Sequence, residues 1–95
     1  MGQITLRISI SENENAVGLT LEGRLVGPWV AELDRAWQEA SAMLHGRPVR
    51  LDLRKVTYSD AGGKRSLRHI FEQTRADIVT SSPWSEYLAA EIKGE

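Results

Sequence analysis

Residues 49–64, VRLDLRKVTYSDAGGK, decide the fold, because a strand pattern changes into a helix pattern within them. Apolar side chains alternate over residues 49–53, which places them on one face of a strand. From Leu67 onward the apolar spacing is helical, so we expect the chain to turn from strand to helix across residues 59–63. Such a junction presents groups for binding.

The start of the second pattern carries the residue types of a helix N-terminus. Asp60 is the expected N-cap, because its carboxylate can accept from the unpaired amides of the first turn. Gly62 and Gly63 let the backbone bend and approach a partner closely. No nucleophile with a base beside it stands in the segment, so we predict a recognition surface and no catalytic residue.

Length and charge limit the classes of function. A chain of 95 residues has room for one domain, spanning 1–95, with a modest core. With 13 acidic and 12 basic residues, no global field favours nucleic acid or an anionic membrane. The segment 47–75 is locally basic, with eight basic residues against three acidic ones. This segment could meet an acidic partner, although a solvated helix face is the simpler interpretation.

Cysteine and histidine usage predicts no metal and no cofactor. The chain contains no cysteine, which excludes disulfides and thiolate ligands and fits a reducing compartment, so cytoplasm is the expected location. His45 and His69 do not have the spacing of a metal site. His69 would also lie about 13 Å along the helix from Asp60, too far for a hydrolytic triad with Ser59.

The N-terminal residues, MGQITLRISI, alternate apolar and polar side chains and lack the pattern of a signal peptide. No apolar run approaches the ~20 residues of a membrane span, so we expect no direct membrane insertion.

The remaining chain alternates strand and helix patterns. Strands are predicted at 4–10, 17–21, 49–53 and 76–80, and helices at 28–44, at 60–75 and from Pro83 after the cap residue Ser82. The order ββαβαβα predicts an α/β fold, with a small mixed β-sheet and helices packed on it.

Two motifs resemble those of the STAS domain, the fold of bacterial anti-sigma factor antagonists and of the cytoplasmic tails of sulfate transporters. Residues 19–25, LTLEGRL, are similar to the family's Leu-x-Gly-x-Leu. Residues 51–63, LDLRKVTYSDAGG, resemble its Asp-Leu-(x-x)-Val-(x-x-x)-Asp-Ser-Ser/Thr-Gly segment. The resemblance covers nearly all of the chain and implies a STAS-like fold.

This sequence also departs from the family pattern. In family members that act as switches, the second hydroxyl residue of Asp-Ser-Ser/Thr-Gly takes a phosphate, and here Gly62 stands at that position. Ala61 replaces the first hydroxyl residue, and Lys64 occupies a place that is usually apolar. Many members add a further strand and helix, so we expect an open sheet edge or an open seat for a helix. An open edge would allow a homodimer.

The resemblance implies that the loop faces a protein partner. We therefore predict partner contacts from residues 59–64, which are Ser59, Asp60, Ala61, Gly62, Gly63 and Lys64, and from Trp29 at the start of the first helix. Ser59 and Thr57 are the candidates for phosphorylation in place of the missing serine, with ordinary loop hydroxyls as the alternative. Trp37 and Trp84 fit the core stripes of their helices.

An anion site at Gly62 to Arg65 is a separate candidate, because a helix N-terminus with nearby cations attracts anions. The full phosphate-binding loop pattern is absent, since Tyr58 replaces its first glycine and Arg65 its Ser/Thr.

The sequence thus predicts a non-enzymatic protein–protein interaction module that resembles a bacterial anti-sigma factor antagonist in transcription regulation. If the resemblance extends to function, the partner is an anti-sigma factor kinase. The alternatives are an anion- or nucleotide-sensing module and a STAS adaptor subunit of a lipid or ABC transporter complex.

Overall fold

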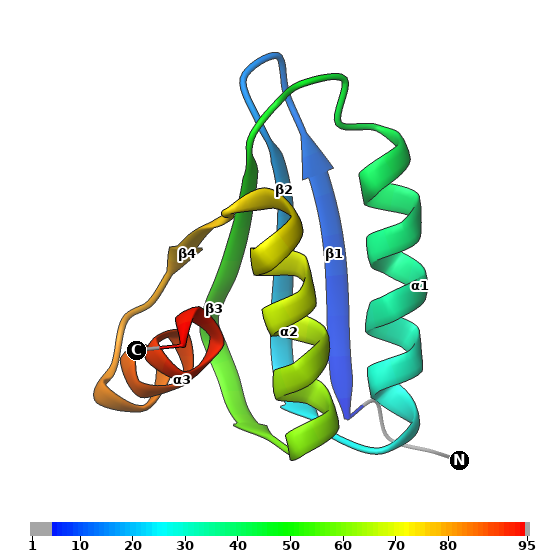
Figure 1. The fold of residues 1–95 in the computed structure, drawn as a ribbon. Helices are drawn as coiled ribbons and strands as arrows, with labels where there is room; N and C mark the ends of the chain where they lie inside the picture. Colours follow the sequence, from blue (N-terminus) through cyan, green and yellow to red (C-terminus); the bar gives the residue numbers. More distant parts are fainter. Residues whose placement is uncertain (1–4, 95) are drawn as a thin grey trace.

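The computed structural model describes residues 5–94, and within them it contains four strands and three helices in the order ββαβαβα (Figure 1). The elements are β1 (Leu6–Glu12), β2 (Val17–Leu25), α1 (Pro28–Ala42), β3 (Val49–Ser59), α2 (Ala61–Thr74), β4 (Asp77–Val79) and α3 (Pro83–Lys93). The predicted fold class, element order and mixed sheet are confirmed. Ile4, which the sequence assigned to the first strand, lies outside the described residues.

The strands form one sheet in the order β1-β2-β3-β4. β1 is antiparallel to β2, whereas β3 runs parallel to both of its neighbours. α1 and α2 lie side by side against the sheet, and α3 packs against α2 and β3 (Figure 1). The carboxyl ends of β2 and β3 therefore lie beside the starts of α1 and α2, where the candidate site is found.

The core lies between the sheet and the helices and consists mainly of leucines. Alternate side chains of β2 and β3 are buried, as the strand period requires. The fully enclosed side chains include Leu19, Leu21, Leu51, Leu67 and Leu88. Because burial of apolar surface is the main favourable term in folding, these positions fix which face of each element turns inward.

The predicted strand at 49–53 is six residues too short. β3 continues to Ser59, through residues that the sequence placed in a loop. The pairing with β2 shows why: Thr20 and Glu22 pair with Asp52 and Lys55, so β3 contains one extra residue there. A second register shift follows, and each bulge interrupts the alternation of buried and exposed side chains.

The other boundaries differ from the prediction by about one to four residues. The predicted helix at 28–44 ends at Ala42, and the predicted strand at 76–80 is reduced to Asp77–Val79. The N-terminal strands lie at Leu6–Glu12 and Val17–Leu25, so both extend further along the chain than predicted. Among the described helices, none is both long enough and apolar enough to cross a membrane.

Candidate functional site

The β3–α2 junction consists of Ser59, Asp60 and the first turn of α2. Asp60 has extended backbone angles, φ −79° and ψ 178°, and its Oδ1 accepts a hydrogen bond from the Gly63 amide at 2.8 Å. The predicted N-cap is therefore confirmed. The cap fixes where β3 ends and α2 begins.

Asp60 also holds a second helix, which the sequence did not reveal. Its Oδ2 accepts from the amide of Gly27 at 3.0 Å, and its own amide donates to the Leu25 carbonyl at 3.1 Å. Gly27 is the N-cap residue of α1 and provides no side-chain cap of its own. One carboxylate therefore caps α2 and ties it to the start of α1. The only available signal was the lack of a capping side chain before Pro28.

These bonds keep Asp60 ionised. The Gly27 amide, followed by the Gly63 amide, lowers the pKa of the Asp60 carboxyl below its ordinary value, and the nearby Arg65 guanidinium acts in the same direction. Each of these groups stabilises the carboxylate form and not the acid. Asp60 is thus a charged and oriented group at neutral pH.

The inner side of the junction is closely packed. Ser59 is only 3% exposed, and its hydroxyl donates to the Asp60 carbonyl at 3.1 Å. A Cβ atom on Gly63 would lie 2.5 Å from Ser59 Oγ and 2.7 Å from Leu25 Cγ, so glycine allows α2 to approach the end of β2. Burial disfavours modification of Ser59, whereas Thr57 is exposed on β3.

The outer side of the same turn is accessible. Ala61 is exposed and Gly62 is partly exposed. A Cβ atom on Gly62 would lie 3.5 Å from Asp60 Oδ1 and 3.7 Å from Arg65 Nη2, which are ordinary contact distances. A side chain therefore fits at Gly62 without displacing its neighbours.

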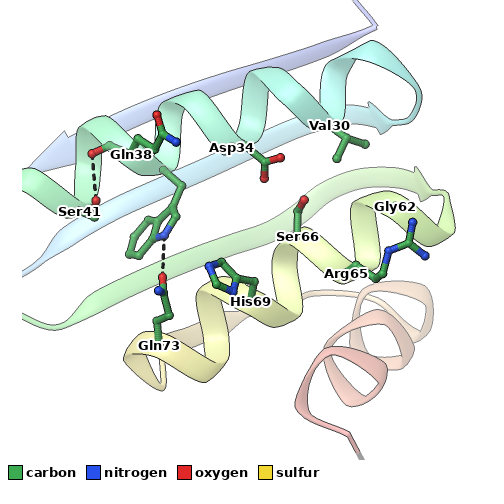
Figure 2. A pocket seen from close by; sticks show the side chains of 10 residues that line it. Val30, Asp34, Gln38, Ser41, Gly62, Arg65, Ser66, His69 and Gln73 are labelled. Atoms are coloured by element: carbon green, nitrogen blue, oxygen red, sulfur yellow. Dashed lines mark hydrogen bonds between the residues drawn. The ribbon is translucent and has the colours of Figure 1, made fainter.

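A groove of about 670 Å³ runs from Gly62 along the space between α1 and α2. Figure 2 shows Asp34 of α1 and Ser66 of α2 pointing toward each other across it, with His69 further along α2. At the far end, Trp37 Nε1 donates to Gln73 Oε1 at 3.0 Å and closes the gap between the helices (Figure 2). Most of the residues that line the groove have polar side chains.

Lys64 is fixed against α3. Its Nζ lies 2.8 Å from Glu91 Oε1, and Arg68 donates to the Glu91 carbonyl at 2.6 Å. The ion pair raises the pKa of the Lys64 ammonium and lowers that of the Glu91 carboxyl. Lys64 can occupy a position where the family pattern is apolar, because its ammonium has this partner.

The three tryptophans occupy different environments. Trp37 is 7% exposed and belongs to the core cluster, as predicted. Trp84 is partly buried, packs on that cluster and donates from Nε1 to the Val56 carbonyl at 2.9 Å. Trp29 is partly buried in the first turn of α1, so most of its ring serves packing. Its partner contact remains a prediction.

Most cations of the segment 47–75 pair with carboxylates. These pairs are Arg47 with Glu12, Arg50 with Asp77, Arg54 with Asp52, Lys55 with Glu22 and Lys64 with Glu91. The local excess of basic residues in the sequence is therefore largely neutralised in space. The exposed pairs contribute little to stability, since water screens them.

Two other candidate sites have little support from the geometry. Over residues 5–94, no group of three or more His, Asp or Glu side chains is placed to hold a metal ion. An anion at the start of α2 would have to compete with the Asp60 carboxylate, which already accepts from Gly63.

Comparison with known proteins identifies the fold. No family model matches the chain, and no curated protein matches it significantly in sequence. An anti-sigma factor antagonist from Mycobacterium paratuberculosis matches in structure with a TM-score of 0.75, over 94% of this chain and 78% of its own, at 14% identity. An uncharacterized protein of the DUF3478 family from Shewanella loihica PV-4, with a SpoIIAA-like fold, has a TM-score of 0.61, covering 99% of this chain and 82% of its own, at 10% identity.

The chain is therefore similar in structure to SpoIIAA-like proteins over almost its whole described length. It has a STAS-like α/β fold, and the resemblance inferred from the two sequence motifs is confirmed at the level of the fold.

Proposed function

We propose that this chain is a single-domain, non-enzymatic interaction module of the bacterial cytoplasm that presents the β3–α2 junction to a protein partner. The observation that carries the proposal is the accessible outer side of the junction, where Ala61 and Gly62 stand on a helix start fixed by Asp60. A fixed backbone loses little conformational entropy on binding, which favours recognition. Asp60, Ala61, Gly62 and Lys64 form the proposed contact region together with Trp29. Ser59 and Gly63, which the sequence also predicted as contacts, are buried and do not face a partner.

We further propose that the partner is an anti-sigma factor kinase and that phosphorylation does not release it. The likeness to an anti-sigma factor antagonist supports this class of partner. Gly62 stands where the STAS pattern places its phosphorylatable hydroxyl, and Ser59 is buried. Of the two candidate phosphorylation sites, Thr57 is the one with an exposed side chain. It lies on β3, so a phosphate there would not stand on the first turn of α2.

The experiment is affinity capture from a lysate of the source organism with three baits: the wild type, Gly62→Asp and Gly62→Asn. Asp and Asn have nearly the same shape, and both should fit at this position. We expect Gly62→Asp to lose the partner because its charge imitates a phosphate, whereas Gly62→Asn retains it in large part. Mass spectrometry identifies the captured proteins, and circular dichroism confirms that each bait is folded.

The outcome separates the alternatives. An ATP-binding kinase-type protein captured by the wild type and Gly62→Asn alone would support the proposal. Equal capture by all three baits would reject the junction as the interface, and recovery of transporter subunits would favour the adaptor alternative. The anion-sensing alternative predicts that phosphate or a nucleotide raises the melting temperature, and no shift across such a panel would remove it.

A further inference from the structure

Two exposed tyrosines lie next to the junction. Within residues 5–94, the large hydrophobic side chains that remain exposed are those of Tyr58, at 46%, and Tyr87, at 57%. Tyr58 is the penultimate residue of β3, and Tyr87 lies on α3, so they come from separate parts of the chain. Isolated exposed aromatic residues are common, but two beside one candidate interface suggest a binding surface.

Each of the two tyrosines has a cation over its ring. Lys64 Nζ lies 5.8 Å from the centre of the Tyr87 ring, within the range of a cation–π contact. The guanidinium carbon of Arg24 lies 5.6 Å from the centre of the Tyr58 ring. We call Arg24, Tyr58, Lys64 and Tyr87 the tyrosine surface.

The tyrosine surface is held in place by the fold. Tyr87 packs against Trp84, with 6.1 Å between ring centres, and Trp84 is hydrogen-bonded to the Val56 carbonyl of β3. Lys64 is held by Glu91. Aromatic side chains that are already ordered bind with a smaller loss of conformational entropy than mobile ones.

The charge around this surface is positive. Arg24 and Arg65 form no ion pair with a carboxylate among residues 5–94, whereas Lys64 pairs with the Glu91 carboxylate and Arg68 donates to the Glu91 backbone carbonyl. The Asp60 carboxylate keeps its charge and lies near Arg65, so it offsets part of the positive charge there. A partner segment rich in Asp and Glu would supply the missing counter-charges.

We propose that the binding surface of the junction extends across the tyrosine surface to α3, and that it receives an acidic segment of the protein partner. This inference rests on the proposed function, because it extends the same interface. Tyrosine and arginine are among the side chains that contribute most to protein interfaces, and here each ring has a cation over it. The partner's carboxylates lie against Arg24, and its apolar side chains lie against the two rings.

The test is site-specific photocrosslinking of the full chain in cells of the source organism. The photoreactive residue p-benzoylphenylalanine replaces, one at a time, Tyr58, Tyr87, Ala61 and the control residue Ser9, which is exposed on β1. We expect Tyr58, Tyr87 and Ala61 to yield adducts with the same protein, through peptides rich in Asp or Glu, and Ser9 to yield none.

Other outcomes contradict the inference in distinguishable ways. An adduct from Ala61 alone would leave the proposed function intact and reject the extension to α3. No adduct from any position would reject both. Adducts with peptides poor in Asp and Glu, with nucleic acid or with lipid would reject the acidic protein segment.

A charge-removal pair provides the second measurement. Arg24→Gln removes a cation of the tyrosine surface, and Arg35→Gln removes an exposed arginine of α1 that pairs with Glu32. For the partner identified through Ala61, we expect Arg24→Gln to raise Kd about tenfold and Arg35→Gln to leave it within about twofold. Equal effects of the two substitutions would reject a specific role for the tyrosine surface.

Discussion

Gly62 and Gly63 are neighbours in one helical turn, yet they have opposite surroundings. A Cβ atom on Gly63 would lie within 3 Å of Ser59 and Leu25, whereas one on Gly62 would meet nothing closer than 3.5 Å. The inner side of the turn is therefore required for packing, and the outer side is free to carry a functional side chain. The two residues are identical in the sequence, but packing requires a glycine only at Gly63.

The comparison also separates residues that have been considered together as a binding site. Ser59 and Gly63 belong to the inner side, and their substitution acts first on stability. Ala61 and Gly62 belong to the outer side, where a substitution can change binding and leave the fold intact. Asp60 joins the two sides, because its carboxylate faces the amides of both α1 and α2.

The largest loss of stability is expected from placing a charge on the inner side of the turn. Ser59→Asp would bury a carboxylate at a position that is 3% exposed, and we expect it to lower the free energy of unfolding by about 3 kcal/mol or more. Thr57→Asp introduces the same charge at an exposed position of β3 and should cost less than about 1 kcal/mol. Urea unfolding of both variants, followed by circular dichroism, measures the difference.

If Ser59→Asp proved as stable as the wild type, the packed inner side would be wrong, and Ser59 would again be a realistic phosphorylation site. Ser59→Ala is the matched control, because it removes the hydroxyl without adding charge. Its effect should be limited to the loss of one hydrogen bond, about 1 kcal/mol.

A smaller change in stability is expected when either glycine is replaced by alanine, which adds one methyl group. Gly63→Ala would force Ser59 and Leu25 to move, and we expect a loss of about 2 kcal/mol from overpacking. Gly62→Ala makes the same chemical change one residue earlier, where the methyl group fits. It should stabilise the chain by about 0.5 kcal/mol, since alanine restricts the unfolded state more than glycine does.

The double variant Ser59→Ala with Gly63→Ala sharpens this comparison. Removing Ser59 Oγ relieves one of the two close contacts, so the losses should not add. Additive losses in urea unfolding would show that the Gly63 methyl group does not meet Ser59.

The sequence predicted the parts of this structure that depend on local periodicity. The alternation in residues 49–53 located the start of β3, and Asp60 identified the start of α2, because strand faces and helix caps are specified within a few residues. It failed at residues 54–58, where two bulges break the alternation, and these bulges depend on pairing with β2.

Contacts between distant segments could not be predicted in the same way. The lack of a capping side chain before Pro28 does not indicate which group binds the Gly27 amide, and the carboxylate that does so lies 33 residues later. Likewise, the two glycines are equivalent in the sequence, and only the close approach of Ser59 and Leu25 makes one of them indispensable. The resemblance to the STAS motif located the candidate site, but it did not divide that site into an inner and an outer side.

The smallest change in stability is expected from substitution of Asp60, and its size depends on pH. Since its pKa is lower in the folded chain than the unfolded value of about 3.9, Asp60 stabilises the fold fully above that pH. This contribution is lost as the pH falls through the folded pKa. We expect Asp60→Asn to be less stable than the wild type at pH 7, and the difference in free energy of unfolding to narrow as the pH falls below about 4.

Taking the difference in stability between the wild type and Asp60→Asn removes the contribution of other carboxylates to the pH dependence. Asp52 beside Arg54 and Glu91 beside Lys64 also have lowered pKa values, so the wild type alone would lose stability in acid for several reasons. These groups are common to both proteins, and their effects cancel in the difference. A difference that stays constant from pH 7 to pH 3 would mean that ionisation of Asp60 is not what joins the two helix starts, and that its neutral oxygens suffice.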